Sequence, residues 1–200
     1  MTEFFDYAVN SILYQRAIYP PETFNRVTKY GLSMMTTADE TLRTYITTIM
    51  GQLKDWLLDG RMRKLVLVVK GIETKETLER WVFDCASTGD ESASETGDAA
   101  SPSKVARTDK KAGKTVKEIQ GEIQALMRQI TASVTFMPLL NEPCSFDLLI
   151  YADADASVPV EWEDSDPCLI ANGEDVTLRS FSTKIHKVEA AVSYRVDDDI

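Results

Sequence analysis

The chain has 200 residues, with 22 Lys and Arg against 32 Asp and Glu and a formal net charge of -10. This acidic balance disfavours nucleic acid and anionic membranes as partners. Three cysteines, Cys85, Cys144 and Cys168, form no CxxC pair, so neither a disulfide framework nor a zinc site is predicted. No apolar run reaches the ~20 residues of a membrane span. Glu3 and Asp6 stand where a signal peptide would be positive, so we expect an intracellular protein.

The first part of the chain predicts a helix and a strand. Apolar pairs recur at helical spacing over residues 3–18, which indicates a helix with one apolar face. Pro20 and Pro21 are expected to end it, because proline removes a backbone donor and restricts the residue before it. Residues 29–35 then alternate between apolar and polar side chains, which predicts a strand.

The clearest helical pattern covers residues 37–59, where apolar side chains form a continuous stripe. Thr37 and Glu40 have the spacing of a capping box, and Gly60 is a typical residue at a helix end. The stripe is wide, so we expect this helix to be buried on much of its circumference.

Two strands and a polar loop are predicted next. The β-branched run 65–69 is typical of a central strand covered on both faces, and the alternating residues 78–83 predict its hairpin partner. Residues 86–113 contain almost no large apolar side chain, so they cannot bury enough surface to offset the entropy of ordering. We expect a disordered loop inside a single domain that spans residues 1–200.

A third helix is predicted over residues 115–137, where apolar side chains again keep helical spacing. Thr115 and Glu118 match the capping box, and Pro138 marks the end. Arg128 and Gln129 lie side by side on the polar face of this helix. Taken alone, such a pair is typical of a solvated surface.

Three strand-like stretches follow, 145–151, 176–183 and 185–196, and the residues between the first two are irregular and acidic. Trp162 lies in that irregular stretch, where a large aromatic side chain usually anchors its segment onto the body of the fold. In total we expect three long helices and about six strands. Because the strands connect through hairpins or long helices, we predict an α+β fold with helices packed on one face of a mostly antiparallel sheet.

The sequence offers little that suggests catalysis. The single histidine, His186, has no nucleophile motif beside it, and a hydrolase that uses Cys144 or Cys168 with His186 is the remaining enzymatic hypothesis. Asp153 and Asp155 have the spacing of a calcium loop, but the glycine and the distal glutamate of that loop are absent. We therefore predict a protein that is not an enzyme and that has no cofactor or metal.

A series of short sequence blocks runs through nearly the whole chain apart from residues 86–113. In chain order the blocks are NSILYQR and IYP (10–20), QLKDWL (52–57), LERW and FD (78–84), RQITA (128–132), CSFDLLIY (144–151), VP and WE (158–163), and LRSF and IHKV (178–188). The series resembles the HORMA family, and most closely its spindle assembly checkpoint members of the mitotic arrest deficient type.

This resemblance implies a peptide-capturing switch. In the family a mobile C-terminal segment, the safety belt, wraps a partner peptide that has added a strand to the edge of the sheet; here it would cover about residues 152–200. Main-chain hydrogen bonds supply affinity in such an arrangement, and side-chain pockets supply selectivity. The resemblance assigns peptide binding to Phe146, Asp147, Leu148, Leu149, Ile150, Tyr151 and Trp162.

The resemblance also implies partners and a location. It assigns Arg128, Gln129 and Phe136 to the surface on which an open and a closed copy pair. The other implied partners are the mitotic activator of the anaphase-promoting complex, which the protein would inhibit, the kinetochore receptor mitotic arrest deficient one, and a HORMA-remodelling AAA+ ATPase with its adaptor. The implied locations are the nucleus, the kinetochore and the cytoplasm, with no nucleic acid or membrane partner.

Two further expectations follow from the family. Its members usually carry a segment before the first helix that supplies a strand in the open form, whereas this sequence begins with Met1-Thr2-Glu3 almost at the helix. Without those contacts the balance should shift towards the closed form. The alternatives within the family are an accessory subunit of a translesion DNA polymerase and a meiotic axis protein.

Overall fold

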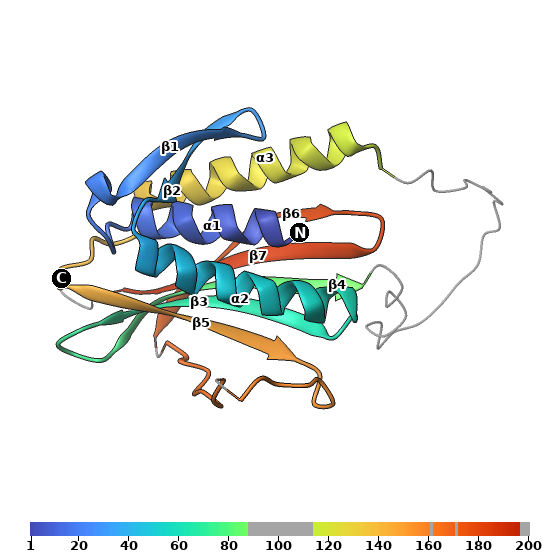
Figure 1. Ribbon diagram of the computed structural model, residues 1–200. Coiled ribbons are helices and arrows are strands. Elements are labelled where there is room, and N and C mark those ends of the chain that lie inside the picture. The colour runs from blue at the N-terminus through green and yellow to red at the C-terminus, as the bar shows by residue number, and fades with distance from the viewer. Residues whose placement is uncertain (88–113, 161, 171, 197–200) are drawn as a thin grey trace, which may run out of the picture.

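A five-stranded antiparallel sheet forms the centre of the fold, and three α-helices pack on one of its faces (Figure 1). The computed structural model describes residues 1–87, 114–160, 162–170 and 172–196. The predicted α+β class is confirmed. In spatial order the strands are β5 (Cys144–Ala152), β3 (Met62–Gly71), β4 (Thr77–Ser87), β7 (His186–Arg195) and β6 (Gly173–Ser182).

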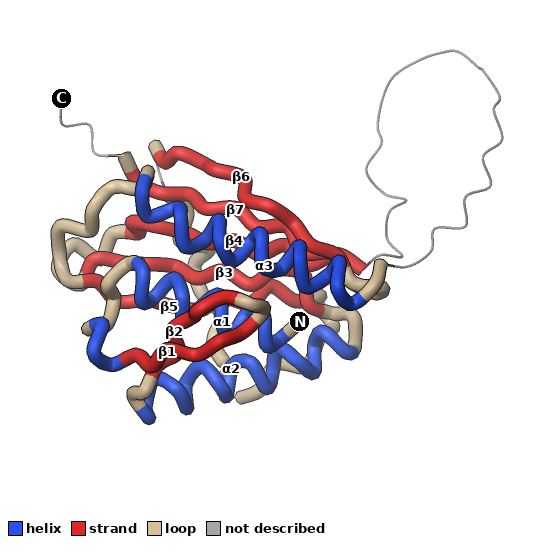
Figure 2. The backbone as a smooth tube through the Cα atoms, turned by 90° about the horizontal axis from the view of Figure 1, so that it is seen from above, coloured by secondary structure: helices blue, strands red, loops and turns tan. Residues whose placement is uncertain are grey.

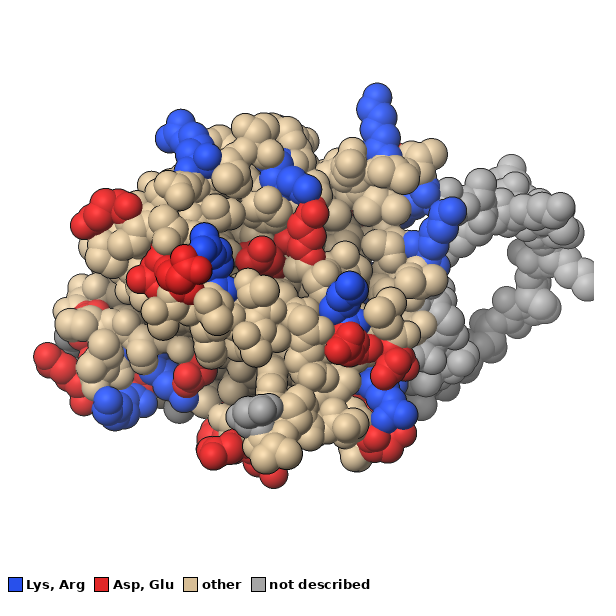
Figure 3. All heavy atoms as spheres, in the orientation of Figure 1, with Lys and Arg blue, Asp and Glu red and all other residues tan. Residues whose placement is uncertain are grey.

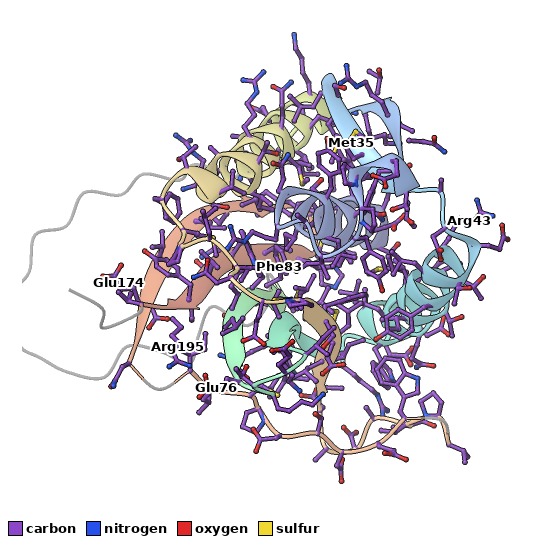
Figure 4. The ribbon with its side chains drawn as sticks, turned by 90° about the vertical axis from the view of Figure 1, so that its left-hand side faces the viewer. Met35, Arg43, Glu76, Phe83, Glu174 and Arg195 are labelled. Carbon is purple, nitrogen blue, oxygen red and sulfur yellow. The ribbon has the colours of Figure 1, made fainter. Side chains whose placement is uncertain are left out.

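Helix α1 (Thr2–Gln15) lies between α2 (Glu40–Leu58) and α3 (Val116–Ala132), as the two views in Figures 1 and 2 show. Because it has neighbours on both flanks and the sheet beneath, α1 is buried around most of its circumference. The ring of Phe4 meets Phe83 of β4 at 5.9 Å and Phe181 of β6 at 4.8 Å between ring centroids. Figure 4 shows Phe83 in this interior. The wide burial predicted for residues 37–59 is wrong, since α2 buries one face only.

A separate hairpin of β1 (Phe24–Lys29) and β2 (Leu32–Thr37) packs against α1. The predicted strand 29–35 is wrong in its bounds, because it runs through the turn. Tyr30 and Gly31 have φ values of 51° and 68°, a left-handed conformation that reverses the chain. The side-chain alternation continues through this turn, so the pattern conceals it.

The start of α2 also differs from the prediction. Thr37 ends β2 and donates its backbone N–H to the Asn10 side chain of α1 at 2.8 Å. The N-cap is Asp39, whose carboxylate accepts the N–H of Leu42 at 2.7 Å. The capping box predicted from Thr37 and Glu40 is therefore wrong. The predicted end of the helix is confirmed, since Gly60 follows α2 with a φ of 68°.

The bounds of the other two helices are shorter than predicted. Helix α1 ends at Gln15, and Ala17 turns the chain with a φ of 52° before the two prolines are reached. Helix α3 ends at Ala132, where a 3-10 turn (Ser133–Thr135) follows. The capping box of α3 is confirmed: the backbone N–H of Thr115 donates to the Glu118 carboxylate at 2.7 Å, and the Thr115 hydroxyl accepts the backbone N–H of Glu118.

Strand β3 is buried on both faces, as predicted. Leu65, Leu67 and Val69 pack into the main core beneath the helices, whereas Val66 and Val68 face the opposite side of the sheet. The predicted loop 86–113 begins too early, because residues 86 and 87 belong to β4; residues 88–113 lie outside the described part of the chain. None of the described helices has the length and apolar character that a membrane span requires.

A buried ion pair joins α1 to the sheet. The Arg16 guanidinium donates to the Glu79 carboxylate at 2.6 Å and to the carbonyl oxygen of Pro138 at 2.6 Å. The Trp81 indole donates to the other carboxylate oxygen at 3.1 Å. Burial raises the pKa of Glu79, and the charge of Arg16 opposes that rise. The pair fixes the end of α1 against β4 and the chain that leads into β5.

Candidate functional site

Strand β5 forms one edge of the sheet and pairs with β3 on its inner side. Just before the strand, the N–H of Ile72 donates to the carbonyl oxygen of Pro143 at 2.8 Å. Hydrogen-bonded and non-bonded pairs alternate along an antiparallel ladder, so this contact fixes which residues point inward. The backbone groups of Phe146, Leu148 and Ile150 therefore point away from β3. They form a row of donors and acceptors that a further strand could meet.

The side chains of the predicted peptide-binding strand divide between the two faces of the sheet. Phe146, Leu148 and Ile150 lie on the helical side and Leu149 and Tyr151 on the opposite side. On that opposite side Asp147 accepts from the ammonium group of Lys70 at 2.9 Å. The six residues predicted as one site are thus of two kinds. Three direct backbone groups outward, and three direct theirs into the ladder.

Two tyrosines complete the helical side of this edge. The Tyr45 ring of α2 and the Tyr19 ring stand edge-on to Phe146, with centroids 5.8 and 6.1 Å away. Tyr45 remains 42% exposed. Burial raises its pKa, and a hydrogen bond with the backbone of Leu148 partly opposes that rise. The sequence pattern does not predict Tyr19 and Tyr45 as site residues, because only the tertiary fold brings them to β5.

Residues 153–172, here named the strap, leave β5 and run beside its outer edge in Figure 1 before they reach β6. The first anchor of the strap is the Asp153 carboxylate, which accepts from the Arg63 guanidinium at 2.7 and 2.8 Å. The second anchor is Trp162, whose ring packs edge-on against Trp56 of α2 at 5.5 Å. The Trp56 indole also donates to the carbonyl oxygen of Ser157 at 3.0 Å.

The third anchor of the strap lies on the other face of the sheet. Cys168 is buried there against Val66 and Val68 of β3. Its backbone N–H donates to the Asp166 carboxylate at 2.7 Å. Since Trp162 contacts the helical side and Cys168 the opposite side, the residues between them pass around the β5 edge. The edge is therefore free of a paired strand and enclosed by the strap.

The three residues predicted for a dimer surface lie near the end of α3 but point differently. Arg128 is exposed beside a cavity of about 250 Å³ that α1, β2 and α3 line. Phe136 is 46% exposed, and its ring contacts Tyr194 of β7 at 6.2 Å. Gln129 is half-buried, and its side-chain oxygen accepts the backbone N–H of Arg179 in β6 at 2.6 Å. Arg128 and Phe136 are therefore available to a partner, whereas the Gln129 oxygen is engaged within the chain.

The enzymatic hypothesis finds no support in the geometry. Cys144 pairs with Gly71 at one end of the sheet, and His186 pairs with Ser87 at the other end. Burial also raises the pKa of the Cys144 thiol, which makes it a poorer nucleophile at neutral pH. Among the described residues no cluster of three His, Cys, Asp or Glu could hold a metal ion.

Charged side chains of both signs are interspersed over the helical face. Figure 3 shows Lys and Arg beside Asp and Glu on this face, with uncharged surface between them. The ion pair of Arg43 and Glu40 on α2 and that of Lys114 and Glu122 on α3 are examples. A partner on this face would therefore meet local charge pairs rather than a field of one sign.

Comparison with known proteins identifies the fold and its branch. Residues 1–186 match the HORMA domain. The chain belongs to the HORMA domain family. The mitotic spindle assembly checkpoint proteins MAD2A of Dictyostelium discoideum and Homo sapiens are each 50% identical to this chain, over 100% and 98% of it and over 91% and 89% of their own lengths. The predicted family and the predicted spindle-checkpoint assignment are confirmed.

Solved structures agree with this HORMA assignment. A chain in the crystal structure of the mitotic checkpoint complex is 44% identical, with a TM-score of 0.82 over 98% of this chain and 96% of that chain. Caenorhabditis elegans HTP-2, solved bound to a HIM-3 closure motif, shares the fold with a TM-score of 0.74 at 16% identity, over 98% of this chain and 88% of that chain.

Proposed function

We propose that this checkpoint protein captures a short segment of a partner as an added strand on β5 and holds it beneath the strap. The observation that carries the proposal is the enclosed edge. The backbone groups of Phe146, Leu148 and Ile150 point outward, while Trp162 and Cys168 hold the strap on opposite faces of the sheet. Strand addition gives affinity through main-chain hydrogen bonds, and a strap around the guest slows its release.

The captured segments are those of the mitotic activator of the anaphase-promoting complex and of the kinetochore receptor mitotic arrest deficient one. Capture of the activator inhibits the ubiquitin ligase that it would otherwise activate. Kinship with checkpoint proteins over nearly the full chain supports this choice over a translesion polymerase subunit or a meiotic axis protein. The protein acts at the kinetochore, in the nucleus and in the cytoplasm, and residues 1–200 form one HORMA domain that carries no enzymatic activity.

Two further partners belong to the same proposal. An open and a closed copy pair through the end of α3, where Arg128 and Phe136 are exposed. A HORMA-remodelling AAA+ ATPase with its adaptor returns the closed form to the open form. In the described arrangement the C-terminal hairpin β6–β7 lies at the far edge from β5, which is the arrangement expected of the closed form.

Amide hydrogen exchange with partner peptides tests the site directly. The full chain is mixed with a peptide from the capture motif of the activator or of the receptor, and a peptide of shuffled sequence serves as the control. We expect the amides of Phe146, Leu148 and Ile150 to become protected on binding. The amides of Asp147 and Leu149 are already paired with β3, so they should change little. Tight binding without this alternating protection would contradict the proposal.

A further inference from the structure

The second edge of the sheet, β6, is covered by side chains of a helix. Helix α3 packs along this strand, as Figure 2 shows from above. Glu122 and Gln129 are seven residues apart, so they lie on the same flank of α3, two turns from each other. Gln129 accepts the backbone N–H of Arg179 at 2.6 Å, and Glu122 accepts the backbone N–H of Ser182 at 3.1 Å.

An irregularity in β6 presents one of these donors to the helix. The pairing of β6 with β7 is regular up to Thr177, shifts register, and resumes at Ser180. Arg179 lies in the shifted part, where a bulge leaves backbone groups outside the ladder. Its N–H points to Gln129 instead.

A cation holds the second contact in place. The Lys114 ammonium group pairs with Glu122 and also donates to the Ser182 hydroxyl at 2.7 Å. Lys114, Glu122 and Ser182 thus form a small network at the start of α3, next to its capping box. Both contacts on β6 come from one rigid helix, and both meet backbone donors, so they depend little on the side chains of β6.

We propose that Glu122 and Gln129 form a latch that fixes the hairpin β6–β7 at the far edge of the sheet and thereby sets how long a captured segment stays beneath the strap. This inference rests on the proposed function. The strap is continuous with β6, so its far end is fixed only while the hairpin stays docked. The ladder between β4 and β7 provides most of the docking, and the latch adds two bonds that must break before the strap loosens.

The latch also links two surfaces. Gln129 belongs to the proposed dimer surface, but its oxygen is committed to Arg179 and only its amide group remains to donate. A second copy that takes the oxygen must break the contact with β6. Binding at the end of α3 is thereby coupled to the docking of the hairpin.

Hydrogen exchange of the free full chain tests the latch without any partner. Gln129→Met keeps the side-chain length and removes the acceptor, and Glu122→Met does the same at the other contact. The matched control is Gln124→Met on the opposite flank of α3, where Gln124 donates to the carbonyl oxygen of Tyr30 at 3.0 Å. Gln129→Glu keeps an acceptor and should behave as the parent chain.

Each latch variant should speed the exchange of the β6–β7 amides about fivefold, and the double variant about 25-fold, since an ordinary hydrogen bond has a net effect of that size. Gln124→Met should leave these amides unchanged, and the β3 amides should be unchanged in all variants. Unaltered β6–β7 exchange in the double variant would overturn the latch. So would an equal change in Gln124→Met.

Peptide release then tests the second half of the inference. With a labelled peptide from the receptor's capture motif, the release rate should rise by the same factors as the exchange rates, and the association rate should change less. Faster exchange with unchanged release would overturn the link to residence time. If the parent chain binds neither partner peptide, the proposed function fails and the residence-time link falls with it, while the exchange data still decide whether the latch exists.

Discussion

The two edges of the sheet are treated in opposite ways. At β6, side-chain acceptors from α3 occupy backbone donors, and the edge is closed to another strand. At β5, the outward row of Phe146, Leu148 and Ile150 faces the strap rather than a helix. An uncovered edge strand invites pairing with other chains, and proteins usually cover or twist it.

The difference teaches where the fold keeps its free valence. The helix at β6 uses two side chains, so its contacts are fixed in place and take no guest. The strap at β5 is anchored at points, by Asp153, Trp162 and Cys168, and between the anchors it encloses the edge without pairing to it. The same sheet is thus closed at one side and receptive at the other.

The largest expected effect is on the receptive edge. Ile150→Pro removes an outward donor and sets a proline ring where a guest strand would lie, while the ladder with β3 stays intact. Peptide affinity, measured by fluorescence anisotropy, should fall about 100-fold, equivalent to ~3 kcal/mol. Leu149→Pro is the matched control because its N–H points into the ladder, and it should instead destabilise the fold. Equal binding by Ile150→Pro and the parent chain would remove β5 as the receiving edge.

The next effect is on the strap. Trp162→Ala removes the ring that packs on Trp56, a contact that is worth about 1 kcal/mol beyond the area it buries. Including that area, release of a bound peptide should become about tenfold faster in stopped-flow displacement. Leu169→Ala changes a strap residue that is 70% exposed, and it should leave release unchanged. A similar acceleration in both variants would mean that the Trp162 anchor has no special role.

A comparable but separate effect is expected at the end of α3. Arg128→Ala and Phe136→Ala should each weaken self-association about tenfold in sedimentation experiments, because truncation of an interface anchor typically has that size of effect. Neither change touches the contact between Gln129 and Arg179. The β6–β7 amides should therefore exchange as in the parent chain, unlike in Gln129→Met. Loosened β6–β7 exchange in Arg128→Ala would erase this distinction.

The smallest effect concerns pH at the start of the strap. The Arg63 guanidinium holds the pKa of Asp153 below its usual value. The charged form is thus favoured in the folded state, so this contribution to stability is present above the unfolded pKa of about 3.9 and is lost as the pH falls through the lower folded value. A carbon-detected titration should place the Asp153 pKa below that of an ordinary aspartate, and Arg63→Gln should raise it. An unchanged value in Arg63→Gln would assign the shift to another cause.

The sequence by itself determined the features that depend on near neighbours. The capping box of Thr115 and Glu118 spans four residues, and the burial of 65–69 follows from an unbroken β-branched run, so both could be predicted. The ordered sequence blocks were enough to place the chain in its family. The predicted strand 145–151 likewise matched β5 to within one residue at each end.

Only the tertiary structure decided which side of each element meets what. The outward alternation in β5 depends on its register with β3, the role of Gln129 depends on a bulge fifty residues later, and Tyr45 reaches Phe146 across a hundred residues. Thr37 lost its predicted cap because β2 and α1 compete for it. Local patterns fix the period and the ends of an element, whereas long-range pairing is chosen by the whole core, and the functional edge of this protein is a product of that choice.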